Sequence, residues 1–204
     1  MSSNVLIVVG SDPGIGATTG SIFAKQKFKK VRFIQERAGE NVEVRTYSVD
    51  ITHTDDFLRV LRDSESLGQM ECLFYNPARV VPSELLKFPS EEVLYDFKAI
   101  PLLQRLPKQE PASKPSILVP NSDLYKDPVP PLLALSLTKT AQRSLVLSLS
   151  KTYGKDVHIA LVSANGPVNL TNKKLNPSYI AAQAWELYNQ EKGHWTNEIE
   201  IVED

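Results

Sequence analysis

Residues 5–16 join a hydrophobic run to a glycine-rich turn and read Val-Leu-Ile-Val-Val-Gly-Ser-Asp-Pro-Gly-Ile-Gly. The run from Val5 to Val9 is apolar at every position and rich in β-branched side chains, which is typical of a central strand of a parallel sheet. A weaker helical pattern follows from Gly16 to Gln26. A strand, a glycine turn and a helix in this order predict a phosphate site, because glycine lets the backbone approach a ligand at the positive end of the helix. The alternative interpretation is a tight turn without a ligand.

The alternation of strand and helix patterns continues to the end of the chain. We expect further strands at residues 31–35, 42–49, 72–75, 117–119 and 158–162, and a half-exposed one around residues 199–201. We expect helices at residues 54–67, capped by Thr52 or Thr54, from Ser90 to about residue 100, and at residues 132–153. A last helix is expected at residues 176–190, with Asn176 as its cap and Pro177 in its first turn. This order predicts an α/β fold, a three-layer, doubly wound Rossmann-type domain over residues 1–204 with a mainly parallel sheet.

Composition limits the partners that this chain could have. Lys and Arg number 23 against 24 Asp and Glu, a balance that argues against a large nucleic-acid or anionic-membrane surface. Cys72 is the single cysteine, so neither an internal disulfide nor a multi-thiolate zinc site is expected, and the three histidines show no metal spacing. No apolar run reaches the ~18 residues of a membrane helix, and the first residues lack a signal-peptide pattern. We therefore expect a soluble cytoplasmic protein that acts on a small molecule, with no membrane, nucleic-acid or metal partner.

The glycine turn, with Gly10, Gly14 and Gly16 spaced G-x-x-x-G-x-G, resembles the T-G-x-x-x-G-I-G loop of the short-chain dehydrogenase/reductase family, with Val9 in place of the threonine. The resemblance continues in order along nearly the whole chain. Val49-Asp50-Ile51 resembles the family's adenine-contacting Asp-Val pair, and residues 76–79 (Asn-Pro-Ala-Arg) resemble its N-N-A-G motif. Ser122 and Lys139 stand where the family has its catalytic serine and the lysine of Y-x-x-x-K, and residues 165–168 resemble the P-G-x-V loop that meets the nicotinamide.

This resemblance implies a site for NADP or NAD. The residues that it assigns to the cofactor are Gly10, Ser11, Gly14, Ile15, Gly16, Arg37, Asp50, Ile51, Asn76, Ala78, Lys139, Gly166, Pro167 and Val168. The choice of cofactor depends on the end of the second strand, where Glu36 would favour the ribose diol of NAD and Arg37 the phosphate of NADP. We slightly favour NADP.

The departures from the family pattern bear on catalysis. Leu135 stands four positions before Lys139, where the family has its proton-donating tyrosine, and Lys98 stands where it has an asparagine. Leucine has no proton to exchange with a substrate oxygen, so the family's usual carbonyl–alcohol reaction cannot run by its usual route. Tyr125, three residues after Ser122, is the candidate replacement; the alternative is a partly exposed loop aromatic. For Lys139 the alternatives are a partner of the ribose hydroxyls and an exposed lysine.

Two functions stay open after these comparisons. One is an oxidoreductase that acts on a carbonyl or alcohol through an altered set of Ser122, Lys139 and Tyr125. The other is a catalytically inactive nucleotide-binding sensor, scaffold or partner subunit. Helices are shortened relative to the family pattern, because only residues 36–41 separate the second and third strands and prolines follow residue 100 closely. A homo-oligomer would be one way to cover the apolar surface that shorter helices leave. Glu198 and Glu200 are expected to be solvated charges.

Overall fold

The computed structural model describes residues 4–11, 13–28, 30–32, 42–49, 53–77, 82 and 114–204. Several expectations lie outside these ranges. They are the roles of Arg37, Asp50, Ile51 and Ala78, the cap at Thr52, the lysine at position 98, the helix beginning at Ser90 and the shortened helices.

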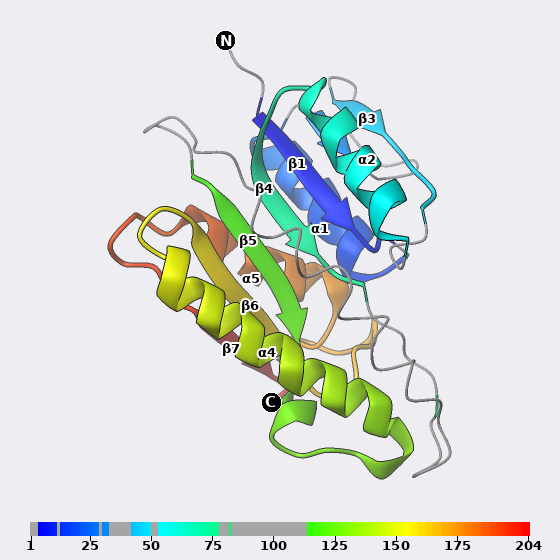
Figure 1. Cartoon of the computed structure of the whole chain (residues 1–204). Helices are drawn as coiled ribbons and strands as arrows, with labels where there is room; N and C mark the ends of the chain where they lie inside the picture. Colours follow the sequence, from blue (N-terminus) through cyan, green and yellow to red (C-terminus); the bar gives the residue numbers. More distant parts are fainter. Residues whose placement is uncertain are drawn as a thin grey trace.

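Among the described residues, seven parallel strands form one sheet in the order β3-β2-β1-β4-β5-β6-β7 (Figure 1). The strands are β1 (Asn4–Val9), β2 (Lys30–Arg32), β3 (Glu43–Arg45), β4 (Gln69–Tyr75), β5 (Ser116–Asn121), β6 (His158–Asn165) and β7 (Glu198–Val202). The chain builds outward from β1 to β3 and then crosses back to β4 on the other side of β1. The point where the order reverses therefore lies between β1 and β4, as in a doubly wound Rossmann sheet.

Helices cover both faces of the sheet, which gives the expected three-layer arrangement of helices, sheet and helices (Figure 1). They are α1 (Ile15–Gln26), α2 (Thr54–Glu65), α4 (Leu133–Tyr153) and α5 (Pro177–Asn189), with short 3-10 turns η2 (Asp123–Tyr125) and η3 (Pro130–Leu132). Strand β1 shows why its sequence is apolar throughout. Leu6 packs with Phe23 of α1 in one core, whereas Ile7 packs with Phe57 of α2 in the other. Both faces of the strand are therefore buried.

Two local predictions are wrong. Among the described residues, the strand expected over residues 42–49 is confined to Glu43–Arg45, which pair with the three residues of β2. Residues 46–49 have no strand pairing there, and Val49 packs against the core that lies beneath α2 and α4. Thr54 does not cap α2, because it is the first residue within the helix and His53 occupies the cap position without a side-chain hydrogen bond.

The cap predicted for α5 is confirmed. The Asn176 side chain accepts a hydrogen bond from the backbone N–H of Tyr179 at 2.9 Å, and Pro177 is the first helical residue. This is the arrangement that satisfies a free N–H at a helix start while using proline where no donor is needed. None of the described helices combines the length and the hydropathy needed to cross a bilayer.

Candidate functional site

Four of the predicted site residues each come directly after a strand. Gly10 follows β1, Asn76 follows β4, Ser122 follows β5 and Gly166 follows β6. These strands are neighbours and all parallel, so their carboxyl ends meet at one edge of the sheet. In open α/β sheets, ligands bind outside this edge, next to the point where the strand order reverses. The fold therefore brings together residues that are more than 150 positions apart, since Gly10 and Gly166 differ by 156.

The glycine turn is packed too closely for side chains. Gly10 has a φ of 76°, and a Cβ added to it would lie 2.6 Å from the backbone oxygen of Asn76. A Cβ on Gly16 would lie 2.1 Å from the backbone oxygen of Gly10. The Asn76 side-chain amide donates to that same Gly10 oxygen at 3.0 Å, and its backbone N–H donates to Val9 at 2.9 Å. The ends of β1 and β4 are thus held against the first turn of α1.

The first turn of α1 has backbone donors to offer. Gly14 occupies its cap position without a side-chain hydrogen bond, and the first turn contains no acidic residue. The first N–H groups of a helix have no partner within it and carry a partial positive charge. This end of α1 suits a phosphate, and the absence of a Cβ at Gly10 and Gly16 lets the ends of β1 and β4 pack against the first turn of α1, which places that turn at the carboxyl edge of the sheet.

Lys139 lies beside the end of β5. Its side chain is buried, with 8% of the residue exposed, and its ammonium donates to the backbone oxygen of Pro120 at 3.0 Å and to Gln142 Oε1 at 3.1 Å. Asn121, the last residue of β5, also contacts α4, because its side-chain amide donates to the Lys139 backbone oxygen at 3.3 Å. The side-chain oxygen of Asn121 accepts from the Ser122 N–H at 2.9 Å. The interpretation of Lys139 as an exposed lysine is therefore wrong.

The Ser122 hydroxyl oxygen is buried and makes no hydrogen bond with any part of the chain that the structure describes. Buried polar atoms are almost always paired, so an unpaired hydroxyl at the carboxyl edge fits a group that a bound molecule would satisfy. Leu135 lies one helical turn before Lys139 and is also buried. An aliphatic side chain thus fills the position where the family pattern has a phenol.

Tyr125 reaches toward β7. Its hydroxyl donates to Glu200 Oε1 at 3.5 Å, and the guanidinium carbon of Arg143 lies 4.4 Å from its ring centroid. Lys126 Nζ pairs with the same Glu200 carboxylate at 2.5 Å, and this hydrogen bond lowers the pKa of Glu200 below its ordinary value. The structure therefore brings Ser122 and Lys139 to the end of β5, whereas the Tyr125 hydroxyl lies in a charged cluster on the edge strand.

Glu198 is a polar residue whose partners the sequence did not indicate. Its carboxylate accepts from Arg143 Nη2 at 2.7 Å and from Ser163 Oγ at 2.7 Å, and its side chain is only 14% exposed. The expectation of a solvated charge is wrong for Glu198, because β7 pairs with β6 and α4 covers the same face. The alternation of Glu198, Ile199, Glu200 and Ile201 places both carboxylates on one face, but it does not show what that face contacts.

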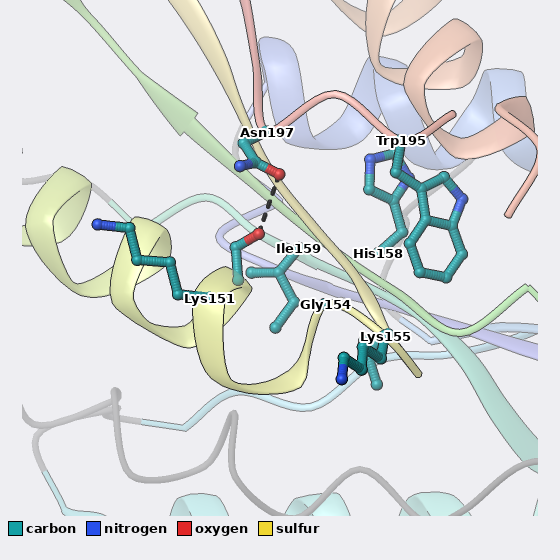
Figure 2. A pocket seen from close by; sticks show the side chains of 9 residues that line it. Lys151, Gly154, Lys155, His158, Ile159, Trp195 and Asn197 are labelled. Carbon is teal, nitrogen blue, oxygen red and sulfur yellow. Dashed lines mark hydrogen bonds between the residues drawn. The ribbon is translucent and has the colours of Figure 1, made fainter. Parts of the chain in front are cut away.

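A hollow of about 210 Å³ lies at the other end of β6 (Figure 2). It is lined by the carboxyl end of α4, the start of β6, and Trp195 and Asn197. The His158 ring stacks on Trp195 with 5.1 Å between centroids, and burial lowers the pKa of His158. Because β6 begins here and ends at Asn165, this hollow is separate from the edge that holds Ser122 and Gly166.

The chain matches no protein-family model, and no curated protein matches it in sequence. Solved structures match it along its length. A short-chain dehydrogenase from Rhodopseudomonas palustris superposes with a TM-score of 0.81 at 18% identity, covering 100% of both chains. Acetoin dehydrogenase from Enterobacter cloacae gives 0.80 at 17% identity, covering 98% of this chain and 95% of the other. An alcohol dehydrogenase from Thermococcus sibiricus, complexed with 5-hydroxy-NADP, gives 0.78 at 17% identity, covering 97% and 95%. The chain has the fold of the short-chain dehydrogenases/reductases.

Proposed function

We propose that the protein binds NADP or NAD at the carboxyl edge of its sheet. The observation that carries this proposal is the packing of Gly10, Gly16 and Asn76 in front of the uncapped first turn of α1. The fold supports it, because the Thermococcus sibiricus protein is complexed with 5-hydroxy-NADP and a metagenomic short-chain oxidoreductase of the same fold is in complex with NADP.

The cofactor would extend along the edge from β1 to β6. The pyrophosphate would lie on the glycine turn, in contact with the backbone of Ser11 and Ile15, and Asn76 would lie beside it. Lys139 would contact the ribose next to the nicotinamide, and residues 166–168 would contact the nicotinamide itself. The residues proposed for the adenosine half are Arg37, Asp50, Ile51 and Ala78, and Arg37 is the reason to expect NADP ahead of NAD.

Ligand-dependent thermal unfolding tests this site. At a concentration 100 times the Kd, a ligand specific to the native state stabilises it by about 2.7 kcal/mol, which for a chain of this size raises the Tm by roughly 5–11 °C. We expect Gly16→Ala to lose this shift, because its methyl group would collide with the Gly10 oxygen and occupy the turn. Gly193→Ala is the control for lost stability alone: its φ of 98° disfavours alanine, but a Cβ there has no neighbour within 4 Å among the described residues, so this variant should lower the Tm and keep the ligand-dependent shift. An unshifted wild-type Tm with millimolar NADP and NAD would refute the proposal.

The first candidate activity is hydride exchange between the bound nicotinamide and a small carbonyl or alcohol substrate. The Ser122 hydroxyl, which has no partner among the described residues, would donate to the substrate oxygen. A proton must also reach that oxygen, and Leu135 supplies none. Tyr125 would do so only after its hydroxyl leaves Glu200. Loss of turnover in Tyr125→Phe, with cofactor binding unchanged, would support this role, and unchanged turnover would remove Tyr125 from the reaction.

The second candidate is a dinucleotide-binding protein without redox turnover, serving as a sensor, scaffold or partner subunit. The burial of Leu135 beside Lys139 favours it, because no proton donor occupies that position. The discriminating measurement is NADPH and NADH oxidation with a panel of aldehydes and ketones, for wild type and for Leu135→Tyr. Turnover that appears only in Leu135→Tyr would support this second candidate, whereas turnover by the wild type would exclude it.

A further inference from the structure

Glu203, the residue after β7, binds the backbone of a distant loop. Its carboxylate accepts hydrogen bonds from the N–H groups of Lys173 at 2.7 Å, Lys174 at 3.0 Å and Leu175 at 2.7 Å. These three residues close the loop of residues 166–176, which joins β6 to α5. The hydrogen bonds from the loop backbone lower the pKa of Glu203, which keeps the carboxylate ionised at neutral pH. One side chain thus satisfies three consecutive backbone donors.

Leu175 connects this carboxylate to the other end of the loop. It is 3% exposed and packs in the core beneath α1 and α5. Its backbone oxygen accepts from the Asn169 N–H at 2.9 Å and from the Asn172 amide at 3.3 Å. The Asn172 amide also donates to the backbone oxygen of Pro167 at 3.0 Å. A Cβ added to Gly166 would lie 2.8 Å from Leu175 Cδ1. Leu175 is therefore joined to Pro167 through the Asn172 amide, and its side chain lies against Gly166.

We propose that Glu203 is a positioning residue for the nicotinamide end of the cofactor site, acting through Leu175 on the loop of residues 166–168. This inference rests on the proposed function. A loop that is ordered before binding loses less conformational entropy when the ligand arrives, and so binds it more tightly. Glu203 supplies that order from the position directly after β7, a strand that carries none of the residues proposed for the cofactor.

A neighbouring ion pair provides a matched control. Asp204 pairs with the Lys174 ammonium at 2.5 Å, so it joins the same two segments as Glu203. The Asp204 side chain is 65% exposed, and its contact is with a side chain and not with the loop backbone. Loss of Asp204 removes a charge next to Glu203 while leaving the three backbone hydrogen bonds in place.

The experiment compares Glu203→Ala, Glu203→Gln and Asp204→Asn in the full chain. Hydrogen exchange at the amides of Lys173, Lys174 and Leu175 reports the contact directly, without any cofactor. Binding of NADPH reports the effect of the Glu203 contact on the whole cofactor site, and binding of 2′-phospho-ADP-ribose, which lacks the nicotinamide, reports its effect on the adenosine half alone. If NAD is the preferred cofactor, NADH and ADP-ribose replace these two ligands. We expect Glu203→Ala to speed exchange at all three amides and to weaken NADPH binding about tenfold, comparable to the loss of one hydrogen bond to a charged group.

The same variant should bind 2′-phospho-ADP-ribose as the wild type does, which a general loss of stability would not allow. Glu203→Gln keeps one acceptor oxygen and should fall between wild type and Glu203→Ala, and Asp204→Asn should resemble the wild type. Unchanged exchange in Glu203→Ala would overturn the contact, and faster exchange with unchanged NADPH affinity would overturn the positioning role. If the wild type binds neither dinucleotide, the proposed function fails and the positioning role fails with it, while exchange still decides whether Glu203 orders the loop.

Discussion

Glu71 offers the sharpest test of what holds the sheet to its helices. It lies on β4, is wholly buried, and sits near the amino end of the strand. Its Oε1 accepts from Lys27 Nζ at 2.7 Å and from the Lys114 N–H at 2.7 Å, and its Oε2 accepts from the Asn4 amide. Lys27 Nζ also donates to the Tyr188 hydroxyl at 2.6 Å. One carboxylate therefore joins β1, the end of α1 and the segment before β5, and reaches α5 through Lys27.

Glu71→Leu would leave all three donors without their acceptor. An unpaired buried donor costs about 1–3 kcal/mol, and the lower end applies here because the Lys27 side chain is 34% exposed and can turn to water. The expected loss is about 3 kcal/mol of unfolding free energy, or roughly 6–12 °C in Tm for a chain of this length. Glu71→Gln keeps the shape and one acceptor oxygen, so it should cost about 1 kcal/mol.

Urea and thermal unfolding, followed by circular dichroism, measure both variants. Glu43→Leu is the control, because Glu43 is 42% exposed and pairs on the surface with Lys30 and Arg45; it should change stability by less than about 1 kcal/mol. A Glu71→Leu protein as stable as the wild type would refute the reasoning. It would mean that the cost of burying this charge equals the free energy of its hydrogen bonds, as happens when apolar residues replace some buried ion pairs.

Three further predictions follow from single side chains. The folded state lowers the pKa of His158 by burial, so the unfolded state binds a proton first as the pH falls. The contribution of neutral His158 to the free energy of unfolding should be fully present above the ordinary histidine pKa of 6.5 and should decline below it. Denaturant titrations at about pH 7 and pH 5 should therefore show a smaller loss of stability in His158→Phe than in the wild type. Ser122→Ala removes a buried hydroxyl that has no partner among the described residues, so the free energy of unfolding of the apoprotein in urea titrations should stay the same or rise by up to about 1 kcal/mol. Any carbonyl reduction should fall in this variant. A loss of more than about 1 kcal/mol of stability would show that the hydroxyl is paired. Glu198→Ala leaves Arg143 and Ser163 without their acceptor; it should cost about 2 kcal/mol by thermal unfolding, more than Glu186→Ala on the exposed side of α5, and equal losses would contradict the buried pair.

The order of elements, and the strand ends that meet at the edge proposed for the cofactor, could be predicted from the sequence because both depend on local patterns. The apolar run at β1, the glycines after it and the Asn176-Pro177 cap each act over a few neighbouring residues. The short β3 could not be predicted, because its length depends on pairing with β2 and not on its own alternation.

By itself, the sequence determined that parallel strands would collect Gly10, Asn76, Ser122 and Gly166 at one edge, since each directly follows a hydrophobic strand and parallel strands end on the same side. Only the tertiary structure decided what each polar side chain contacts. It buried Lys139 against the end of β5 and directed the Tyr125 hydroxyl to Glu200, a residue 75 positions away. The physical reason is that a hydrogen bond depends on the distance and direction between two groups, and for groups so far apart in the chain only the packing of the whole sheet determines both.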